Sequence, residues 1–306
     1  MTNAPIDPLA IIELTNVKAS GRLADLAKHP SLAMTPEWMK ELAQSKDWSV
    51  RQALAENPAI AECLKVTEIL ANDEHRFVRI YLAQNPAIAN CPEITEKLST
   101  DKDPWVRQAL ADNRAIANCP KIAAILSSDE HWPVRSNLAQ NPALANCPEV
   151  VAVLVRDENH HVRRALATNP AITASPEAIK TLSSDDVRSV RAALASSTTI
   201  ANFPAITQKL CNDEHHTVRS ALAQSRAIAN LPDGIEKLSK DRSTNVRRAV
   251  ANNPAIGAFP ETMERLAADK NWYVRGALAQ NPAIPSATAS QQPWQARPFV
   301  QKAPTL

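Results

Sequence analysis

The cysteines are the first residues of this chain whose type and spacing suggest chemistry. Four of the five recur every 28 residues, at Cys63, Cys91, Cys119 and Cys147. Regular thiols invite a disulfide or metal site, but equivalent positions in stacked helical units lie one interhelical spacing apart, ~8–10 Å. A disulfide needs Cα atoms within ~7 Å, so neighbours in this column are not expected to bond. Because the column later holds Ser, Phe and Leu residues, we interpret it as a half-buried filler position.

Histidine is the second candidate for metal chemistry. Six of the seven histidines fall in segments that we expect to be loops: His75, His131, His160, His161, His215 and His216. The doublet at 160–161, with His131 one interval earlier, could offer imidazole nitrogens to zinc. However, no cysteine or carboxylate recurs with these histidines in a ligand-like spacing such as H-x-x-x-H. We therefore predict no metal site and no other cofactor.

Aspartate and arginine form the third regular pattern. Arginine follows valine nine times, from Arg51 to Arg275, and aspartate stands six residues before eight of these arginines, with Ser45 as the exception. Catalysis by nine equivalent arginines is implausible. Arg79 would project toward the loop carrying Asp73, or toward the matching aspartate of the next unit, where a guanidinium can bridge a carboxylate and loop carbonyls. We predict a structural ladder of charged pairs.

All three patterns share one period, so the elements that position them must repeat. The dipeptide Val-Arg begins nine times at intervals of 28 residues, from Val50 to Val274, with no insertion or deletion. Fixed self-similarity of this length is the signature of a stacked-repeat protein, in which each unit packs on its neighbours. Aromatic residues make up 4% of the chain, so the buried layers must be built from Leu, Ile, Val and Ala.

Within one unit, the residues that typically start and end helices predict two short helices. Pro92-Glu93 begins a first helix with proline at its first position and an acid in its first turn. A polar loop leads to a second helix over 105–112, in which Val106, Leu110 and Ala111 face the core. Asn-Pro ends this helix, because the residue before proline is forced out of the helical region. The following link is short enough for at most one 3₁₀ turn. We call the two helices helix A and helix B.

The combined motif carries a family resemblance. L-x-x-D-x-x-x-x-V-R-x-A-L-A-x-N-P, with P-E before the next helix, resembles the leucine-rich repeat variant family, and D-x-x-x-x-V-R opening a second helix is similar to HEAT-type repeats. The resemblance covers roughly residues 17 to 285 and implies an α-solenoid that serves mainly as a binding scaffold. The expected fold is all-α, a right-handed α-solenoid of about ten stacked 28-residue helical repeats.

Three segments are expected along the chain. Residues 1–43 read as an N-terminal helix, begun by Asp7-Pro8, and a degenerate capping repeat in which Arg22-Leu23 replaces Val-Arg. Residues 44–285 hold the regular repeats. Residues 286–306 are rich in Gln, Ala, Ser and Pro and are expected to be a disordered tail, in which Trp294 and Phe299 could form a short linear motif.

Charge and hydropathy limit the partners and the cellular location that we expect. The net charge of +2 implies no long-range field toward nucleic acid or an anionic membrane. No secretory signal is recognisable, and no apolar stretch reaches the ~18 residues needed to span a bilayer. A cytoplasmic location is the default expectation, and five cysteines fit reduced thiols better than a disulfide framework.

The most informative positions keep the period but not the identity. On helix B, the residues one before valine, two after it and six after it share a face away from the core, and we call this face the helix-B stripe. Because its chemistry is rich in amides with scattered aromatics, we predict that it binds an extended polypeptide. The candidate partner-binding residues are Phe77, Ile80, Tyr81, Trp105, Gln108, His161, Arg164, Arg248 and Tyr273.

Two interpretations of the aromatic residues near the N-terminal end remain open. Phe77, Ile80, Tyr81 and Trp105 fall in adjacent units, and Tyr81 occupies a column that is alanine almost everywhere else. They could form an apolar anchor pocket for a partner. They could equally be ordinary half-exposed fillers without a partner.

Three function classes follow from these patterns. The favoured one is a non-enzymatic scaffold that binds a protein or peptide along the concave helix-B face. A nucleic-acid-binding HEAT-like solenoid is the alternative, but it requires a repeated basic column, and only Arg164 and Arg248 are basic in the stripe. An enzyme is disfavoured, since no Ser-His-Asp, Cys-His, glycine-rich or paired-carboxylate constellation interrupts the repeat.

Overall fold

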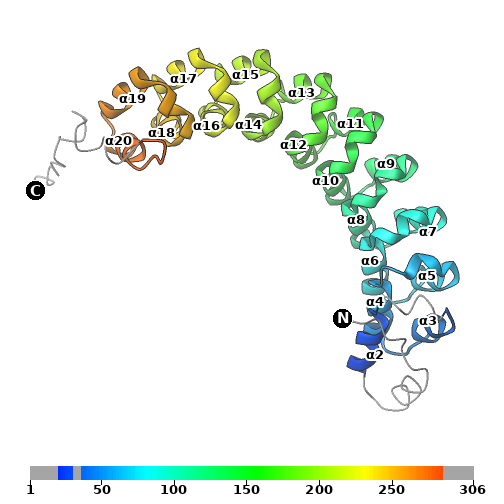
Figure 1. Ribbon diagram of the computed structural model, residues 1–306. Coiled ribbons are helices and arrows are strands. Elements are labelled where there is room, and N and C mark those ends of the chain that lie inside the picture. The colour runs from blue at the N-terminus through cyan, green and yellow to red at the C-terminus, as the bar shows by residue number, and fades with distance from the viewer. Residues whose placement is uncertain (1–19, 30–35, 285–306) are drawn as a thin grey trace, which may run out of the picture. The chain divides into compact units, whose positions relative to one another are not determined.

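The computed structural model describes residues 20–29 and 36–284, and all regular structure within them is helical (Figure 1). Three expectations fall outside these residues: the helix begun by Asp7-Pro8, part of the capping repeat around Pro30, and the tail at 286–306. The chain divides into two compact units between Ala171 and Ile172. Each unit is described by itself.

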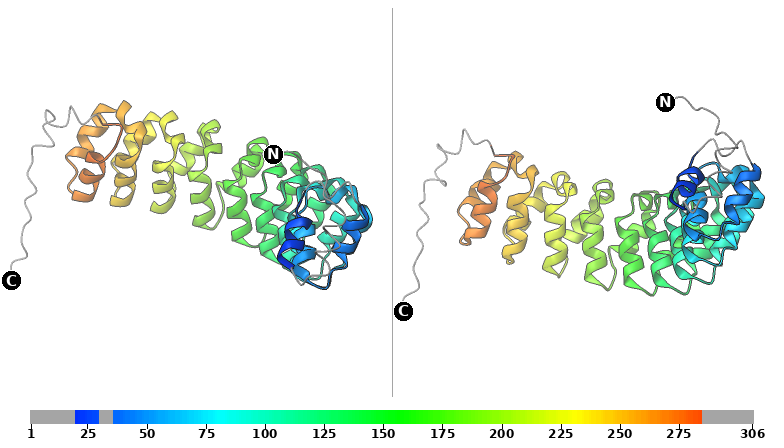
Figure 2. Two further views of the ribbon diagram at one scale, coloured as in Figure 1. Left: turned by 60° about the horizontal axis from the view of Figure 1, so that its bottom comes forward. Right: turned by 90° about the horizontal axis from the view of Figure 1, so that it is seen from below.

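Two rows of helices build the first unit (Figures 1 and 2). The helices A are α3 (Pro36–Ala43), α5 (Leu64–Ala71), α7 (Pro92–Ser99), α9 (Pro120–Ser127) and α11 (Pro148–Leu154). The helices B are α2 (Ser20–Ala27), α4 (Trp48–Ala55), α6 (Arg76–Gln84), α8 (Pro104–Asp112), α10 (Trp132–Gln140) and α12 (His160–Thr168). Short 3₁₀ helices follow the helices B from α4 onward: η2 (Ile60–Glu62), η3 (Pro86–Asn90), η4 (Arg114–Asn118) and η5 (Pro142–Asn146). The next, η6 (Pro170–Ala174), contains the division between the two units.

The second unit repeats this plan. Its helices A are α13 (Pro176–Leu182), α15 (Pro204–Cys211), α17 (Pro232–Ser239) and α19 (Pro260–Ala267). Its helices B are α14 (Arg188–Ser196), α16 (His216–Gln224), α18 (Thr244–Asn252) and α20 (Trp272–Ala279), and its 3₁₀ helices are η7 (Thr198–Asn202), η8 (Arg226–Asn230) and η9 (Pro254–Ala258). The chain is therefore an all-α repeat solenoid, as the period predicted.

The core consists of the columns expected to be buried. Val106, Leu110 and Ala111 on α8 are fully buried, and Leu98 on α7 meets them from the helix A side. Helix A begins at the predicted proline. Helix B begins one residue earlier than predicted, at Pro104, because the Asp103 side chain accepts a hydrogen bond from the N–H of Trp105 and caps the helix there.

The 3₁₀ link is longer than the single turn that we expected. It spans five residues in most repeats, and η3 includes both the proline and the following residues up to Asn90. The side chain of Asn85 starts it by accepting a hydrogen bond from the N–H of Ala87 at 3.0 Å. Because Pro86 has no N–H to leave unpaired at the first position, the proline that ends helix B also opens this segment.

The charged columns form the expected ladder, and the structure identifies the partner. Arg107 donates from Nε and Nη2 to the two carboxylate oxygens of Asp129, in the next repeat, at 2.5 and 2.9 Å. Its Nη1 donates to the main-chain oxygen of Asp101, in the loop before its own helix, at 2.7 Å. Each guanidinium thus joins the carboxylate of the following repeat to a carbonyl of its own repeat.

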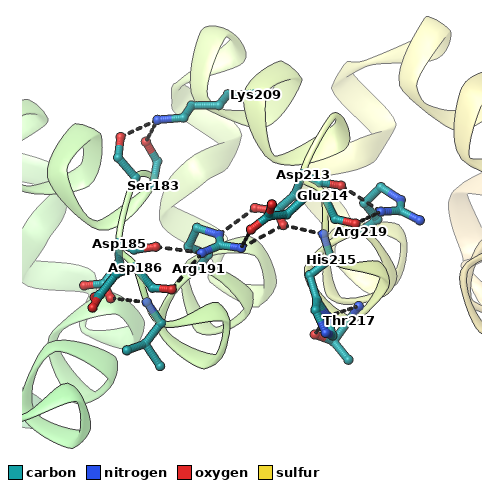
Figure 3. Close-up of polar contacts among 12 residues, drawn as sticks. Ser183, Asp185, Asp186, Arg191, Lys209, Asp213, Glu214, His215, Thr217 and Arg219 are labelled. Carbon is teal, nitrogen blue, oxygen red and sulfur yellow. Dashed lines mark hydrogen bonds and ion pairs between the residues drawn. The ribbon is translucent and has the colours of Figure 1, made fainter.

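The same pairing recurs in both units. The first unit has the pairs Arg51–Asp73, Arg79–Asp101, Arg107–Asp129 and Arg135–Asp157. The second unit has the pairs Arg191–Asp213, Arg219–Asp241 and Arg247–Asp269. Figure 3 shows Arg191 between Asp185 and Asp213, with Arg219 one repeat further on. The side chains in these pairs are at most 10% exposed, so water screens them weakly.

The arginine and aspartate side chains of the ladder are held in their charged forms. Burial alone raises the pKa of the Asp129 carboxyl, but hydrogen bonds from Arg107 and from the His131 N–H outweigh burial and lower the pKa below its usual value. The same balance lowers the pKa values of Asp241 and Asp269. The hydrogen bond with Asp129 raises the pKa of Arg107. Both members of these pairs are therefore charged at neutral pH.

A second ladder, built from the asparagine of Asn-Pro, was not predicted. Asn141 donates from Nδ2 to the main-chain oxygens of Ala111 and Asn113 in the preceding repeat, at 2.9 and 3.0 Å. Its Oδ1 accepts a hydrogen bond from the N–H of Ala143 at 2.9 Å. The side chain is buried. The bonds to the preceding repeat are shared by Asn57, Asn85, Asn113, Asn169, Asn253 and Asn281.

Serine interrupts this ladder at Ser225. Its shorter side chain accepts a hydrogen bond from the N–H of Ala227 at 3.2 Å, but it makes no bond to the preceding repeat among the residues described. The backbone at Ser225 (φ −69°, ψ 146°) resembles that of the ladder residue Asn253 (φ −75°, ψ 125°). An asparagine at this position can therefore adopt the ladder geometry with a small change in ψ.

We accordingly predict that Ser225→Asn stabilises the second unit by about 1 kcal/mol, because it adds bonds to buried carbonyls of the preceding repeat. Urea unfolding followed by circular dichroism measures this change in the free energy of unfolding. Ser184→Asn is the control, since Ser184 is exposed and lies outside the ladder. Destabilisation by Ser225→Asn would show that the backbone there cannot adopt the asparagine geometry.

The cysteine column behaves as a packing position. All five cysteines are free thiols; Cys63 and Cys119 are half-buried, whereas Cys91 and Cys147 are fully buried before helix A. Burial raises the pKa of the Cys91, Cys147 and Cys211 thiols, so they stay protonated at neutral pH.

None of the described helices has the length and apolar character of a membrane span. The cytoplasmic location stays a prediction.

Candidate binding surface

The helix-B stripe lies outside the core in both units. Of its nine described triplets, every member is exposed or half-buried except Ser136, which is 8% exposed. The valine and leucine columns between them are buried, and so are the ladder arginines except Arg163, which is half-buried, and Arg275, which is exposed. Fixed and varied residues of helix B are thus separated by burial, so the varied ones can change without disturbing the stacking of the repeats.

The candidate partner-binding residues occupy both units. In the first unit, Ile80, Tyr81 and Gln108 are half-buried, while Phe77, Trp105, His161 and Arg164 are exposed. In the second unit, Arg248 on α18 and Tyr273 on α20 are exposed, and the Tyr273 ring lies 3.6 Å from that of Trp272. The nine residues therefore mark a surface on each unit and not one compact site.

The structure changes the expected grouping around Phe77. Its ring lies 5.9 Å from Trp48 and 5.5 Å from His75, and the guanidinium of Arg76 lies 5.2 Å from its centre. Trp48 also stacks on His75 at 4.3 Å. Trp105, which we had grouped with Phe77, makes no ring contact within the described part of the chain. Phe77 therefore belongs to a ring cluster with Trp48 and His75, and Trp105 is not part of it.

Tyr81 lies near a charged pair of the first unit. Lys28 and Glu56 form an ion pair at 2.8 Å. The hydrogen bond to Glu56 raises the pKa of Lys28, and the negative form of Tyr81 adds a smaller contribution.

Three histidines that were expected in loops belong to helices. His160 and His161 open α12, and His216 opens α16, because the Asn159 and His215 side chains cap these helices one residue earlier. His161 stacks on Trp132 of the preceding repeat at 4.9 Å. Within the described ranges, no three His, Cys, Asp or Glu side chains are grouped as a metal ion would require.

Sequence reasoning missed two aromatic residues of this surface in the first unit, and it missed Trp272, which is 50% exposed, in the second. Trp48 and Trp132 are the first residues of α4 and α10, and they are 40% and 41% exposed. They fall one position before the stripe column that contains Phe77 and Trp105, so a column-by-column comparison separates them. Comparing the first two positions of helix B together would have grouped all four.

The arginines that recur with the repeat period do not form a row of free positive charge on the surface. Arg51, Arg79, Arg107 and Arg135 turn their guanidinium groups to carboxylates in the first unit. Arg164 and Arg248 are the exposed basic residues of the stripe. The repeated basic column that the sequence shows is therefore neutralised inside the repeats and does not form a basic face.

Comparison with known proteins identifies a solved structure with a similar fold. No protein-family model and no curated protein matches the chain. The structure is similar to a solved structure described as a leucine-rich repeat variant with a novel repetitive protein structural motif, with a TM-score of 0.50 and 21% identity over 78% of this chain and 88% of that one. At this identity the likeness concerns the fold alone. It confirms the resemblance drawn from the motif, and the chain has the fold of a helical repeat solenoid.

Proposed function

We propose that this chain is a non-enzymatic scaffold that binds a protein or peptide along its helix-B stripe, on the concave side of the repeats. The observation that carries the proposal is the separation between fixed and varied positions. Core residues and most ladder residues recur with the repeat and are buried, whereas the exposed residues of helix B differ from repeat to repeat. A row of differing exposed side chains on a regular frame suits recognition of one extended partner.

The composition of the surface supports a polypeptide over nucleic acid. Nucleic-acid binding draws its affinity from lysines and arginines that contact phosphates. Here the regular arginines are engaged with buried carboxylates, and the exposed basic residues of the stripe are Arg164 and Arg248, on separate units. Exposed rings and amides, such as Trp105 and Gln108, are better suited to side chains and main-chain groups of a peptide.

Affinity purification with matched variants tests this function. The stripe variant carries Gln108→Ala, His161→Ala and Arg164→Ala, and the control variant carries Lys65→Ala, Glu68→Ala and Lys97→Ala on exposed positions of helices A. We expect proteins that copurify with the wild type to be lost from the stripe variant and kept by the control. Equal recovery with both variants, at unchanged thermal stability, would contradict binding along the stripe.

A further inference from the structure

The last helix B of the second unit exposes positions that are buried in the helices B before it. In the described part of this unit, α19 and α20 are the last helices (Figure 1). Ala279 on α20 is exposed, whereas the alanines of the same column in the helices B from α4 to α18 are fully buried. Arg275 is exposed too, whereas its counterpart Arg247 is 7% exposed. We call this side of α20 the terminal face; it consists of Trp272, Arg275 and Ala279.

Within the first unit, α4 shows what this side of a helix B binds. It has the same three residue types at the same positions, as Trp48, Arg51 and Ala55. Arg51 donates from Nε and Nη2 to the two carboxylate oxygens of Asp73 at 2.5 and 2.9 Å. Trp48 stacks on His75 with 4.3 Å between the ring centres. One short loop of the following repeat therefore supplies both a carboxylate and a ring to α4.

A second carboxylate of the same loop lies close to the guanidinium. Glu74 follows Asp73 directly, and its carboxylate lies 3.9 Å from Nη2 of Arg51. In the second unit, the equivalent Glu214 lies 3.4 Å from Nη2 of Arg191. The side of helix B that carries the ladder arginine thus accommodates two successive acids.

The terminal face has the same donors and acceptors without these contacts. Arg275 donates from Nη1 to the main-chain oxygen of Asp269 at 2.8 Å, as the other ladder arginines do in their own repeats, so its guanidinium is already anchored. Among the described residues, no carboxylate pairs with Arg275 and no side chain donates to the main-chain oxygen of Ala279. The oxygen of Ala251, one repeat earlier, accepts a hydrogen bond from Asn281 at 2.7 Å. The terminal face therefore keeps an anchored donor pair and a free acceptor.

The charge around Arg275 is positive. Lys270 stands next to the carbonyl that Arg275 contacts, and its side chain is exposed. The carboxylate of Asp269 is balanced by Arg247, whose Nε lies 2.6 Å from it. Arg275 and Lys270 therefore leave two positive charges at this end of the unit, and charge complementarity favours an acidic occupant.

Two other occupants match this face less well. Residues 285–306, which follow in the sequence, contain no aspartate or glutamate, and Arg297 stands where the 28-residue register would place the aspartate. A second copy of the chain offers Asp-Glu-His at 73–75, 129–131 and 213–215, but these aspartates are already paired with ladder arginines of their own chain. An acidic loop of a different protein is therefore favoured.

From these observations we propose that the terminal face binds an acidic loop of a partner protein, in which two successive carboxylates are followed by a ring. The first carboxylate accepts hydrogen bonds from Nε and Nη2 of Arg275, and the second adds attraction to the same guanidinium and to Lys270. The ring of the loop packs on Trp272, which is 50% exposed. The terminal face is a second interaction site, and it does not depend on the function proposed for the helix-B stripe.

Fluorescence polarisation with synthetic peptides tests the proposal on the full chain. The probe is a labelled peptide with the sequence of residues 72–90, which contains the loop that α4 binds. The comparison peptide differs only by Asp73→Asn. We expect the probe to bind, and the comparison peptide to bind about tenfold more weakly, because it lacks the carboxylate. Arg275→Met in the protein should weaken the probe by a similar factor. Arg226→Met, which removes an exposed arginine on η8, should have no effect.

Three results would overturn the proposal: no binding of the probe, equal binding of the two peptides, or equal binding by the wild type and Arg275→Met. Sedimentation that shows a dimer abolished by Arg275→Met would identify a second copy as the occupant and would also overturn it. The function proposed for the helix-B stripe would survive each of these results, because its test uses substitutions in the first unit that leave α20 intact. Thermal unfolding of each variant shows that the fold is kept.

Discussion

Replacement of Arg107 by methionine is expected to lower the free energy of unfolding by about 3–5 kcal/mol, because it leaves a buried charge without its partner. The Asp129 side chain is 5% exposed and loses both of its hydrogen bonds to the guanidinium. The main-chain oxygen of Asp101 loses a bond as well. Two neighbouring repeats are therefore uncoupled at one point of the ladder.

A second substitution separates loss of the pair from the cost of the remaining charge. Asp129→Asn in the Arg107→Met background removes the uncompensated charge and keeps an oxygen for the N–H of His131, which is bonded at 2.9 Å. We expect the double variant to be more stable than Arg107→Met alone. Urea unfolding at neutral pH measures both changes. A double variant that is less stable would show that the unpaired carboxylate of Asp129 is not the main cost of Arg107→Met.

Replacement of Asn141 by alanine is expected to cost about 2–4 kcal/mol of unfolding free energy, because three buried main-chain groups lose their hydrogen-bond partner at once. These groups are the oxygens of Ala111 and Asn113 and the N–H of Ala143. Water cannot replace the side chain easily, since Asn141 is 2% exposed. The substitution leaves the hydrophobic columns unchanged.

Asn146→Ala provides the matched control. Asn146 ends the same 3₁₀ helix but is exposed, and a surface change of this kind is expected to stay within about 0.5 kcal/mol. Urea unfolding monitored by circular dichroism compares the two variants. Equal stability of Asn141→Ala and Asn146→Ala would mean that the asparagine ladder adds nothing to the free energy of unfolding, and that the apolar core alone holds the repeats together.

Much of the fold follows from the sequence, because the repeat supplies its own alignment. Nine copies of Val-Arg show which columns are fixed, and proline marks where helix A begins. The direction of the charged ladder could not be read in the same way. Arg79 stands close in sequence to Asp73, whereas its carboxylate partner, Asp101, lies 22 residues ahead. Only the stacking of the repeats decides between them.

The asparagine ladder was overlooked for a related reason. An Asn-Pro dipeptide has a sufficient local explanation, since proline ends a helix, and this explanation hides the longer-range role. The contacts of Asn113 reach back 28 and 30 residues to the preceding repeat. The replacement of this asparagine by serine at Ser197 and Ser225 was the one sequence signal that the position does more than stop a helix.

The position of the candidate binding surface could be predicted from the sequence, but the contacts among its side chains could not. Variation within a fixed period identified the face of helix B that lies outside the core. Ring clusters such as Trp48 with His75 join adjacent repeats, so they depend on distances between helices that no single column contains.

Site-specific photocrosslinking tests the central claim most directly. A photoreactive amino acid is placed at Arg164, exposed on α12, or at Ala152, exposed on the neighbouring α11. Both positions lie in the first unit, so they share expression and folding. Binding along the helix-B stripe predicts discrete crosslinked species from position 164 and none above background from position 152. Crosslinks from position 152 alone would place the partner on the row of helices A and contradict the account.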